Sequence, residues 1–162
     1  MSKIKELLNK EDTVLVFDVD GVLALLEFGE YNHYDLLDDA DWTKANAEGQ
    51  NFYTEEKVSN KVKNFLKTKD MSRVYVITKV GNNNEGEYKR LFANKYYNIP
   101  LENVYYIDND SDKSNKMLEI KKNYPDLEDY KVVMIDDTTE VLNDIQMHTK
   151  FSTAHVSSLL DI

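Results

Sequence analysis

Short apolar runs separated by amphipathic segments form the framework of the chain. Four runs are almost continuously apolar and rich in Val, Ile or Tyr, at residues 13–17, 73–77, 103–107 and 131–135. Residues 150–156 form a weaker fifth run. Continuous apolar runs of this length are typical of strands buried on both faces of a parallel sheet.

Helical patterns fill the intervals between these runs. Residues 55–69, 85–97, 111–124 and 138–147 each place apolar side chains three or four positions apart, which predicts one buried helical face. In the second of these segments the predicted face carries Tyr88, Leu91, Phe92 and Tyr96. A short leading helix is expected within residues 1–10. Strands alternating with helices predict an α/β fold, a three-layer, Rossmann-like open parallel sheet of about five strands with helices on both faces.

One connection is too long for this scheme. About 2–6 residues usually join a strand to the next helix, yet residues 23–54 separate the first strand from the first full helix. We therefore expect a single domain over residues 1–162, with a flap or minimal cap inserted at about 23–54. Its aromatic residues Tyr31, Tyr34 and Trp42 suit either a wall facing a substrate or packing of the loop itself.

Composition narrows the range of settings and partners. The net charge of −10 and pI near 4.8 disfavour a nucleic-acid partner. The absence of cysteine excludes disulfides, thiolate catalysis and zinc–thiolate sites, and it favours a cytoplasmic location. The N-terminus lacks the apolar stretch of a signal peptide. Asp18 and Asp20 interrupt the longest apolar-rich run, so no membrane span is expected.

Polar side chains end the predicted strands. Asp18 and Asp20 follow the first strand, Thr78 follows the second, and Asp136 with Asp137 follows the fourth. The carboxyl ends of parallel strands meet at one edge of the sheet, where ligands bind. Carboxylates brought together there raise one another's pKa, and Mg²⁺, which prefers oxygen ligands, removes that cost. A carboxylate beside such a cation can attack a phosphate and form an aspartyl-phosphate.

Four segments, taken in order, resemble the signatures of the haloacid-dehalogenase superfamily. Residues 17–23, Phe-Asp-Val-Asp-Gly-Val-Leu, resemble the first signature, and residues 74–78 resemble the second, a strand ending in Thr or Ser. A lysine at a helix start looks like the third. Residues 132–137, Val-Val-Met-Ile-Asp-Asp, look like the fourth. The resemblance implies a phosphoric monoester hydrolase that uses Mg²⁺ and an aspartyl-phosphate intermediate.

The resemblance also implies a role for each matching residue. Asp18 would be the nucleophile and a metal ligand, and Asp20 would be the general acid and base, with its backbone carbonyl also binding metal. Thr78 would donate a hydrogen bond to a phosphoryl oxygen. Asp136 would ligate Mg²⁺, and Asp137 would do so directly or through water. The presence of Asp20 favours phosphate chemistry over carbon–halogen chemistry.

Two lysines compete for the third signature. Lys113 lies in the first turn of the predicted helix, at the end that faces the site, whereas Lys116 lies one turn deeper. We assign to Lys113 the neutralisation of the nucleophile and phosphate, and keep Lys116 as the alternative.

Other functions share parts of this pattern. A phospho-acceptor receiver domain gathers similar groups, but its acidic pair follows the first strand and its acceptor a later one, the reverse of the order here. A non-catalytic binding protein of the same superfamily and a phosphotransferase are further alternatives. The expected partner is a phosphorylated small molecule. A site without a large cap accepts bulky substrates or is closed by a neighbouring subunit, so a homo-oligomer is also considered.

Overall fold

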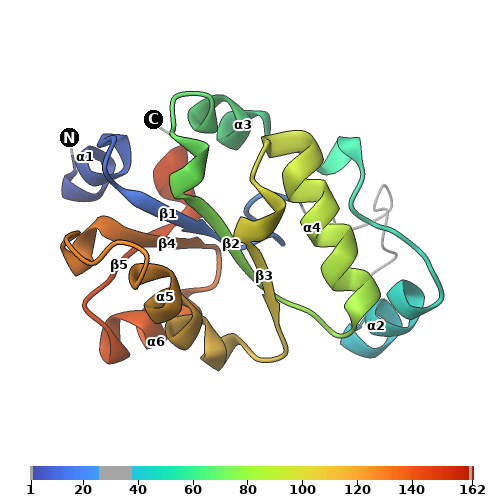
Figure 1. Ribbon diagram of the computed structural model, residues 1–162. Helices are drawn as coiled ribbons and strands as arrows, with labels where there is room; N and C mark the ends of the chain where they lie inside the picture. The colour runs from blue at the N-terminus through green and yellow to red at the C-terminus, as the bar shows by residue number, and fades with distance from the viewer. Residues whose placement is uncertain (1, 26–37, 161) are drawn as a thin grey trace.

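The computed structural model describes residues 2–25, 38–160 and 162. Five parallel strands form one sheet in the order β3-β2-β1-β4-β5, with β1 at its centre (Figure 1). The strands are β1 (Val14–Phe17), β2 (Val74–Lys79), β3 (Val104–Ile107), β4 (Val132–Asp136) and β5 (Ser152–His155). The predicted five-stranded, Rossmann-like parallel sheet is thus confirmed, with strand ends within a few residues of those expected.

Helices cover both faces of this sheet (Figure 1). They are α1 (Lys3–Asn9), α2 (Asp39–Ala47), α3 (Asn60–Leu66), α4 (Asn83–Tyr97), α5 (Lys113–Lys121) and α6 (Thr139–His148). Because successive side chains of a strand point to opposite faces, Leu15 and Phe17 of β1 pack with α1, α3 and α4. Val14 and Val16 pack with α5 and α6 on the other face. The predicted three layers are therefore present.

The segment predicted as a helix over residues 55–69 is shorter and interrupted. A 3-10 turn at Glu55–Lys57 is followed by Val58, which is extended and pairs with Ala24 in an isolated bridge. The Ser59 side chain then accepts a hydrogen bond from the Val62 amide and caps α3. Pairing between distant residues thus overrides the local helical pattern.

The buried face of α4 also differs from the prediction. Leu91 is 55% exposed, so its predicted place on the buried face is wrong. Glu85 and Lys89 are buried instead, in line with Phe92 of the same helix. Two ionisable side chains therefore occupy the part of α4 that lies nearest the ends of the strands.

The two ends of the insert at residues 23–54 lie close together. The Leu25 amide donates to the Lys57 carbonyl at 2.8 Å, and the Ser59 amide donates to the Leu23 carbonyl. Within the insert, the Asp38 carboxylate accepts a hydrogen bond from the Asp41 amide and begins α2. The insert therefore holds a helix, and its base is fixed to the segment before α3.

Helix α2 packs against the beginning of α4 (Figure 1). The Asn82 side chain donates to the Thr43 carbonyl at 2.8 Å, and Asn84 donates to the Asn46 carbonyl at 3.1 Å. Trp42 stacks on Phe52 with ring centroids 4.3 Å apart, so it packs within the insert. Its predicted companions, the tyrosines at positions 31 and 34, lie outside the described residues. Among the described helices, none is both long enough and apolar enough to cross a membrane.

Candidate active site

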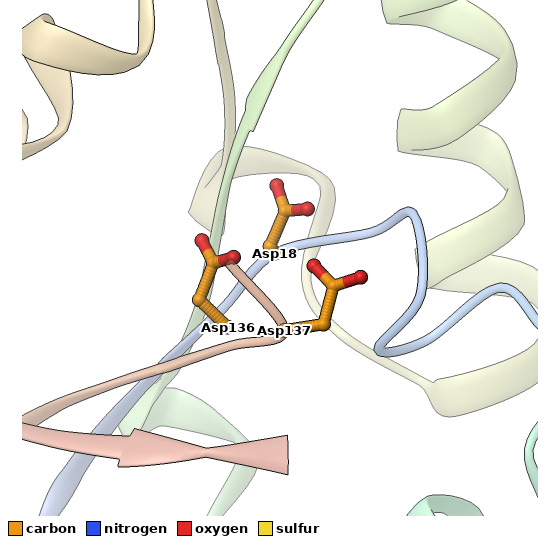
Figure 2. A group of neighbouring side chains, drawn as sticks. All are labelled: Asp18, Asp136 and Asp137. Carbon is orange, nitrogen blue, oxygen red and sulfur yellow. The ribbon is translucent and has the colours of Figure 1, made fainter. Parts of the chain in front are cut away.

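Three carboxylates gather where the two central strands end. Asp18 follows β1, Asp136 is the last residue of β4, and Asp137 comes next (Figure 2). One carboxylate oxygen from each of the three lies within 4.8 Å of the others. Asp18 and Asp136 are buried, and Asp137 is more accessible. The Asp18 amide donates to the Ile135 carbonyl at 3.0 Å, so the pairing of β1 with β4 holds these residues side by side.

A tight turn after β1 leaves room for this group. Gly21 has a φ of 72°, and its amide donates to the Ala24 carbonyl at 2.9 Å. A β-carbon added at Gly21 would lie 2.1 Å from Oδ2 of Asp137. Only glycine can take this φ without strain and also admit the Asp137 carboxylate so closely.

Lys113 supplies the positive charge beside the nucleophile candidate. Its Nζ atom lies 2.8 Å from Oδ2 of Asp136, 3.2 Å from Oδ1 of Asp18 and 3.2 Å from Oδ1 of Asp110. The side chain is only 3% exposed. Lys116, the alternative, is 26% exposed and pairs instead with Glu119 of its own helix. Of the two lysines, Lys113 is the one whose ammonium contacts Asp18.

Asp20 lies outside the three-carboxylate group and forms an ion pair with a different lysine, Lys89. Oδ2 of Asp20 lies 2.7 Å from Nζ of Lys89, and Oδ1 accepts a hydrogen bond from the Tyr53 hydroxyl at 3.0 Å. Lys89 also donates to the buried Thr78 hydroxyl at 3.2 Å. The sequence-predicted residues Asp20 and Thr78 are thus joined through a third residue, Lys89 of α4.

Burial and neighbouring charges shift several pKa values in the site. Burial raises the pKa of Asp18 to about 7; Lys113 opposes this rise, and Asp136 and Asp20 add to it. Burial also raises the pKa of Asp137, and the charge of Asp136 raises it further. For Lys113, burial lowers the pKa, but Asp18 and Asp136 outweigh burial and raise the pKa above the ordinary lysine value.

These residues fit a magnesium ion. Asp18, Asp136 and Asp137 offer hard oxygen ligands close together, the kind of donor that Mg²⁺ prefers. The raised pKa values of Asp18 and Asp137 mean that ionising these carboxyl groups costs extra free energy. A bound divalent cation would remove that cost. The Asp20 carboxylate does not belong to the three-residue group, and metal binding by its backbone carbonyl remains a prediction.

Sequence reasoning missed Lys89, Glu85 and Tyr53. Glu85 is buried, and its Oε1 lies 2.8 Å from Nζ of Lys89. A signal for the first two was present, because Glu85 and Lys89 are one helical turn apart and Phe92 continues the same stripe. An acid–base pair inside an apolar stripe indicates a buried ion pair rather than a solvated face.

Comparisons with known proteins support the fold. No protein-family model matches the chain, and no curated protein matches its sequence. A solved structure, described as that of DsGPDH of Dunaliella salina, is similar to it, with a TM-score of 0.56 and 17% identity. The similarity covers 94% of this chain and 25% of that one, so this chain spans about a quarter of its length. At this identity the similarity shows the Rossmann-like fold alone.

Proposed function

We propose that this protein is a Mg²⁺-dependent phosphohydrolase that cleaves a phosphate monoester through an aspartyl-phosphate on Asp18. One observation carries the proposal: Asp18 and Asp20 are only two residues apart in the sequence, yet their side chains contact different groups. Asp18 lies with Lys113 and the acidic pair after β4, whereas Asp20 lies apart and contacts Lys89 and Tyr53. Such a separation suits a nucleophile and a proton-transfer group with different tasks. The four signature-like segments support the same assignment.

In the first step, an Asp18 carboxylate oxygen attacks phosphorus, and the bond from phosphorus to the leaving oxygen breaks. Asp20, in its protonated form, gives its proton to that oxygen, which leaves as an alcohol. Thr78 and Lys113 bind the phosphoryl oxygens through their hydroxyl and ammonium groups. A magnesium ion held by Asp18, Asp136 and Asp137 would neutralise charge on the phosphoryl group.

In the second step, water attacks the phosphorus of the aspartyl-phosphate. Asp20, now a carboxylate, accepts a proton from that water, and the bond between phosphorus and the Asp18 oxygen breaks. Inorganic phosphate leaves, and Asp18 and Asp20 return to their starting forms. The 32% exposure of the Asp20 side chain is consistent with access to both a leaving group and water.

The order of the strands disfavours the receiver alternative. Flavodoxin-like sheets, the kind that receiver domains have, show the strand order 2-1-3-4-5. Here the order is β3-β2-β1-β4-β5, the arrangement of the first five strands in dinucleotide-binding sheets. The acidic pair follows β4, and Asp18, the proposed phosphate acceptor, follows the first strand, which is the reverse of the receiver arrangement.

Hydrolysis of p-nitrophenyl phosphate with and without Mg²⁺ tests the proposal. We expect turnover with Mg²⁺, loss of turnover in excess EDTA, and background turnover by Asp18→Asn, because an amide is not a nucleophile here. In acid-quenched wild-type protein, a phosphoryl label removable by hydroxylamine would identify the acyl phosphate. The exposed Asp126 allows a matched control, since Asp126→Asn should keep the wild-type rate. Full turnover in EDTA or by Asp18→Asn would refute the mechanism.

A further inference from the structure

Lys89 is held more tightly than an ordinary helix lysine. Its side chain is 1% exposed, and four oxygen atoms surround its ammonium group. They are Oδ2 of Asp20 at 2.7 Å, Oε1 of Glu85 at 2.8 Å, the Lys79 carbonyl at 2.6 Å and the Thr78 hydroxyl at 3.2 Å. An ammonium has only three N–H donors, so every donor has a protein acceptor within reach.

Asp20 is in turn fixed through both carboxylate oxygens. Lys89 contacts Oδ2, and the Tyr53 hydroxyl donates to Oδ1 at 3.0 Å. Proton transfer requires the acid to lie within hydrogen-bond reach of the reacting oxygen, about 2.6–3.2 Å. A carboxylate that is a third exposed would otherwise rotate among several positions.

Glu85 fixes the other side of Lys89. Besides its ion pair with Lys89, its Oε2 accepts a hydrogen bond from the Gly81 amide at 2.8 Å. Its Oε1 accepts one from the indole nitrogen of Trp42 at 3.3 Å. Burial lowers the pKa of Lys89, but Asp20 and Glu85 outweigh burial and raise it, so the ammonium stays charged. A continuous chain of contacts therefore runs from Trp42 of α2 through α4 to Asp20.

We propose that Lys89 is a positioning residue that holds the Asp20 carboxyl group in the place required for proton transfer to the leaving group. This inference rests on the proposed function. Lys89 contacts Asp20 at 2.7 Å and the Thr78 hydroxyl at the longer distance of 3.2 Å, so its main effect on the reaction is expected through Asp20. It is distinct from Lys113, which contacts Asp18. Loss of Lys89 should therefore resemble partial loss of Asp20 rather than loss of phosphate binding.

The leaving group provides the decisive readout. p-Nitrophenyl phosphate leaves without much help from an acid, whereas an alkyl phosphate requires protonation. We expect Lys89→Met to raise the ratio of kcat/KM for p-nitrophenyl phosphate over the alkyl phosphate by at least about tenfold, since general acid catalysis contributes roughly 10²–10⁴-fold. In the Asp20→Asn background, Lys89→Met should leave that ratio unchanged. Lys95→Met, an exposed position on the same helix, is the control.

A second measurement does not depend on activity. If Lys89 and Asp20 hold each other, the loss in Tm of Lys89→Met/Asp20→Asn should be smaller than the sum of the losses in the single variants. Lys89→Gln, which keeps a donor in the buried position, replaces Lys89→Met if the latter does not fold. Suppose that the wild type is active and Asp18→Asn is inactive. Additive losses in Tm, or a substrate ratio in Lys89→Met equal to that of the wild type, would then overturn this inference alone. Absence of any hydrolysis by the wild-type protein would overturn the proposed function and this inference with it.

Discussion

Replacing Lys113 with methionine removes the charge beside Asp18 while keeping a side chain of similar length on α5. The lost ammonium lies 2.8 Å from an Asp136 oxygen and 3.2 Å from an Asp18 oxygen. A charge-assisted hydrogen bond to phosphate contributes about 1.5–3 kcal/mol. At about 1.4 kcal/mol for each factor of ten, we expect kcat/KM to fall roughly 10- to 150-fold.

Stability should change as well, in a pH-dependent way. Leaving a buried charge without its partner costs about 3–5 kcal/mol. Here that is an upper limit, because burial already raises the pKa of Asp18 to about 7, and without Lys113 this carboxyl group can take up a proton instead. Lys113→Met should therefore lower the free energy of unfolding more at pH 8 than at pH 6, as measured by urea unfolding.

Lys116 is the matched control on the same helix. Its ammonium pairs with Glu119 at 2.6 Å on the exposed side, where an ion pair contributes less than about 1 kcal/mol. Lys116→Met should keep kcat/KM for p-nitrophenyl phosphate within about twofold of wild type. Equal losses in the two variants, or a larger loss in Lys116→Met, would refute the assignment of the phosphate-neutralising role to Lys113.

Two further predictions concern Asp18 and the turn that follows it. Because burial raises the pKa of Asp18 from 3.8 to about 7, the unfolded chain releases this proton at lower pH than the folded one. Without metal, this group should lower the free energy of unfolding by about 2 kcal/mol between pH 5 and pH 7. Urea unfolding in EDTA should show this decline in the wild type and a smaller decline in Asp18→Asn. Parallel pH profiles of the two proteins would contradict the prediction. Gly21→Ala should weaken Mg²⁺ binding, measured by calorimetry, because its β-carbon would lie 2.1 Å from an Asp137 oxygen. Gly49→Ala, also at positive φ but with nothing within 4 Å, should cost about 1 kcal/mol of stability and leave Mg²⁺ affinity unchanged, so similar Mg²⁺ affinities in the two variants would contradict the prediction.

The sheet could be predicted because its signal is local. Residues 14–17 of β1 and 132–135 of β4 are all apolar, and both strands are fully buried. The proximity of Asp18 and Asp136 could be predicted because the carboxyl ends of parallel strands lie at the same edge of the sheet. The strand order and the central place of β1 then account for their proximity.

What could not be predicted depends on contacts between distant segments. Val58 continues an apolar helical pattern, but its pairing with Ala24 makes it extended. Leu91 fits the apolar stripe of α4 by spacing, yet the helix turns Lys89 inward to meet Asp20, 69 positions earlier in the chain. The local spacing pairs Glu85 with Lys89, but no local pattern identifies Asp20 as their partner, so the orientation of α4 becomes apparent only in the assembled fold.

The central position of β1 also determines how the protein can lose its order. Among the described strands, β3 and β5 each have a neighbour on one side only, whereas β1 is hydrogen-bonded to both β2 and β4. Backbone amides of core strands generally need the largest opening free energies, up to that of global unfolding, before they exchange with deuterated solvent. The amide of Asp18 donates to the Ile135 carbonyl just beyond the last residue of β1, so we expect it to exchange among the slowest. We therefore expect the nucleophile candidate to stay ordered during any partial unfolding that begins at the edges of the sheet.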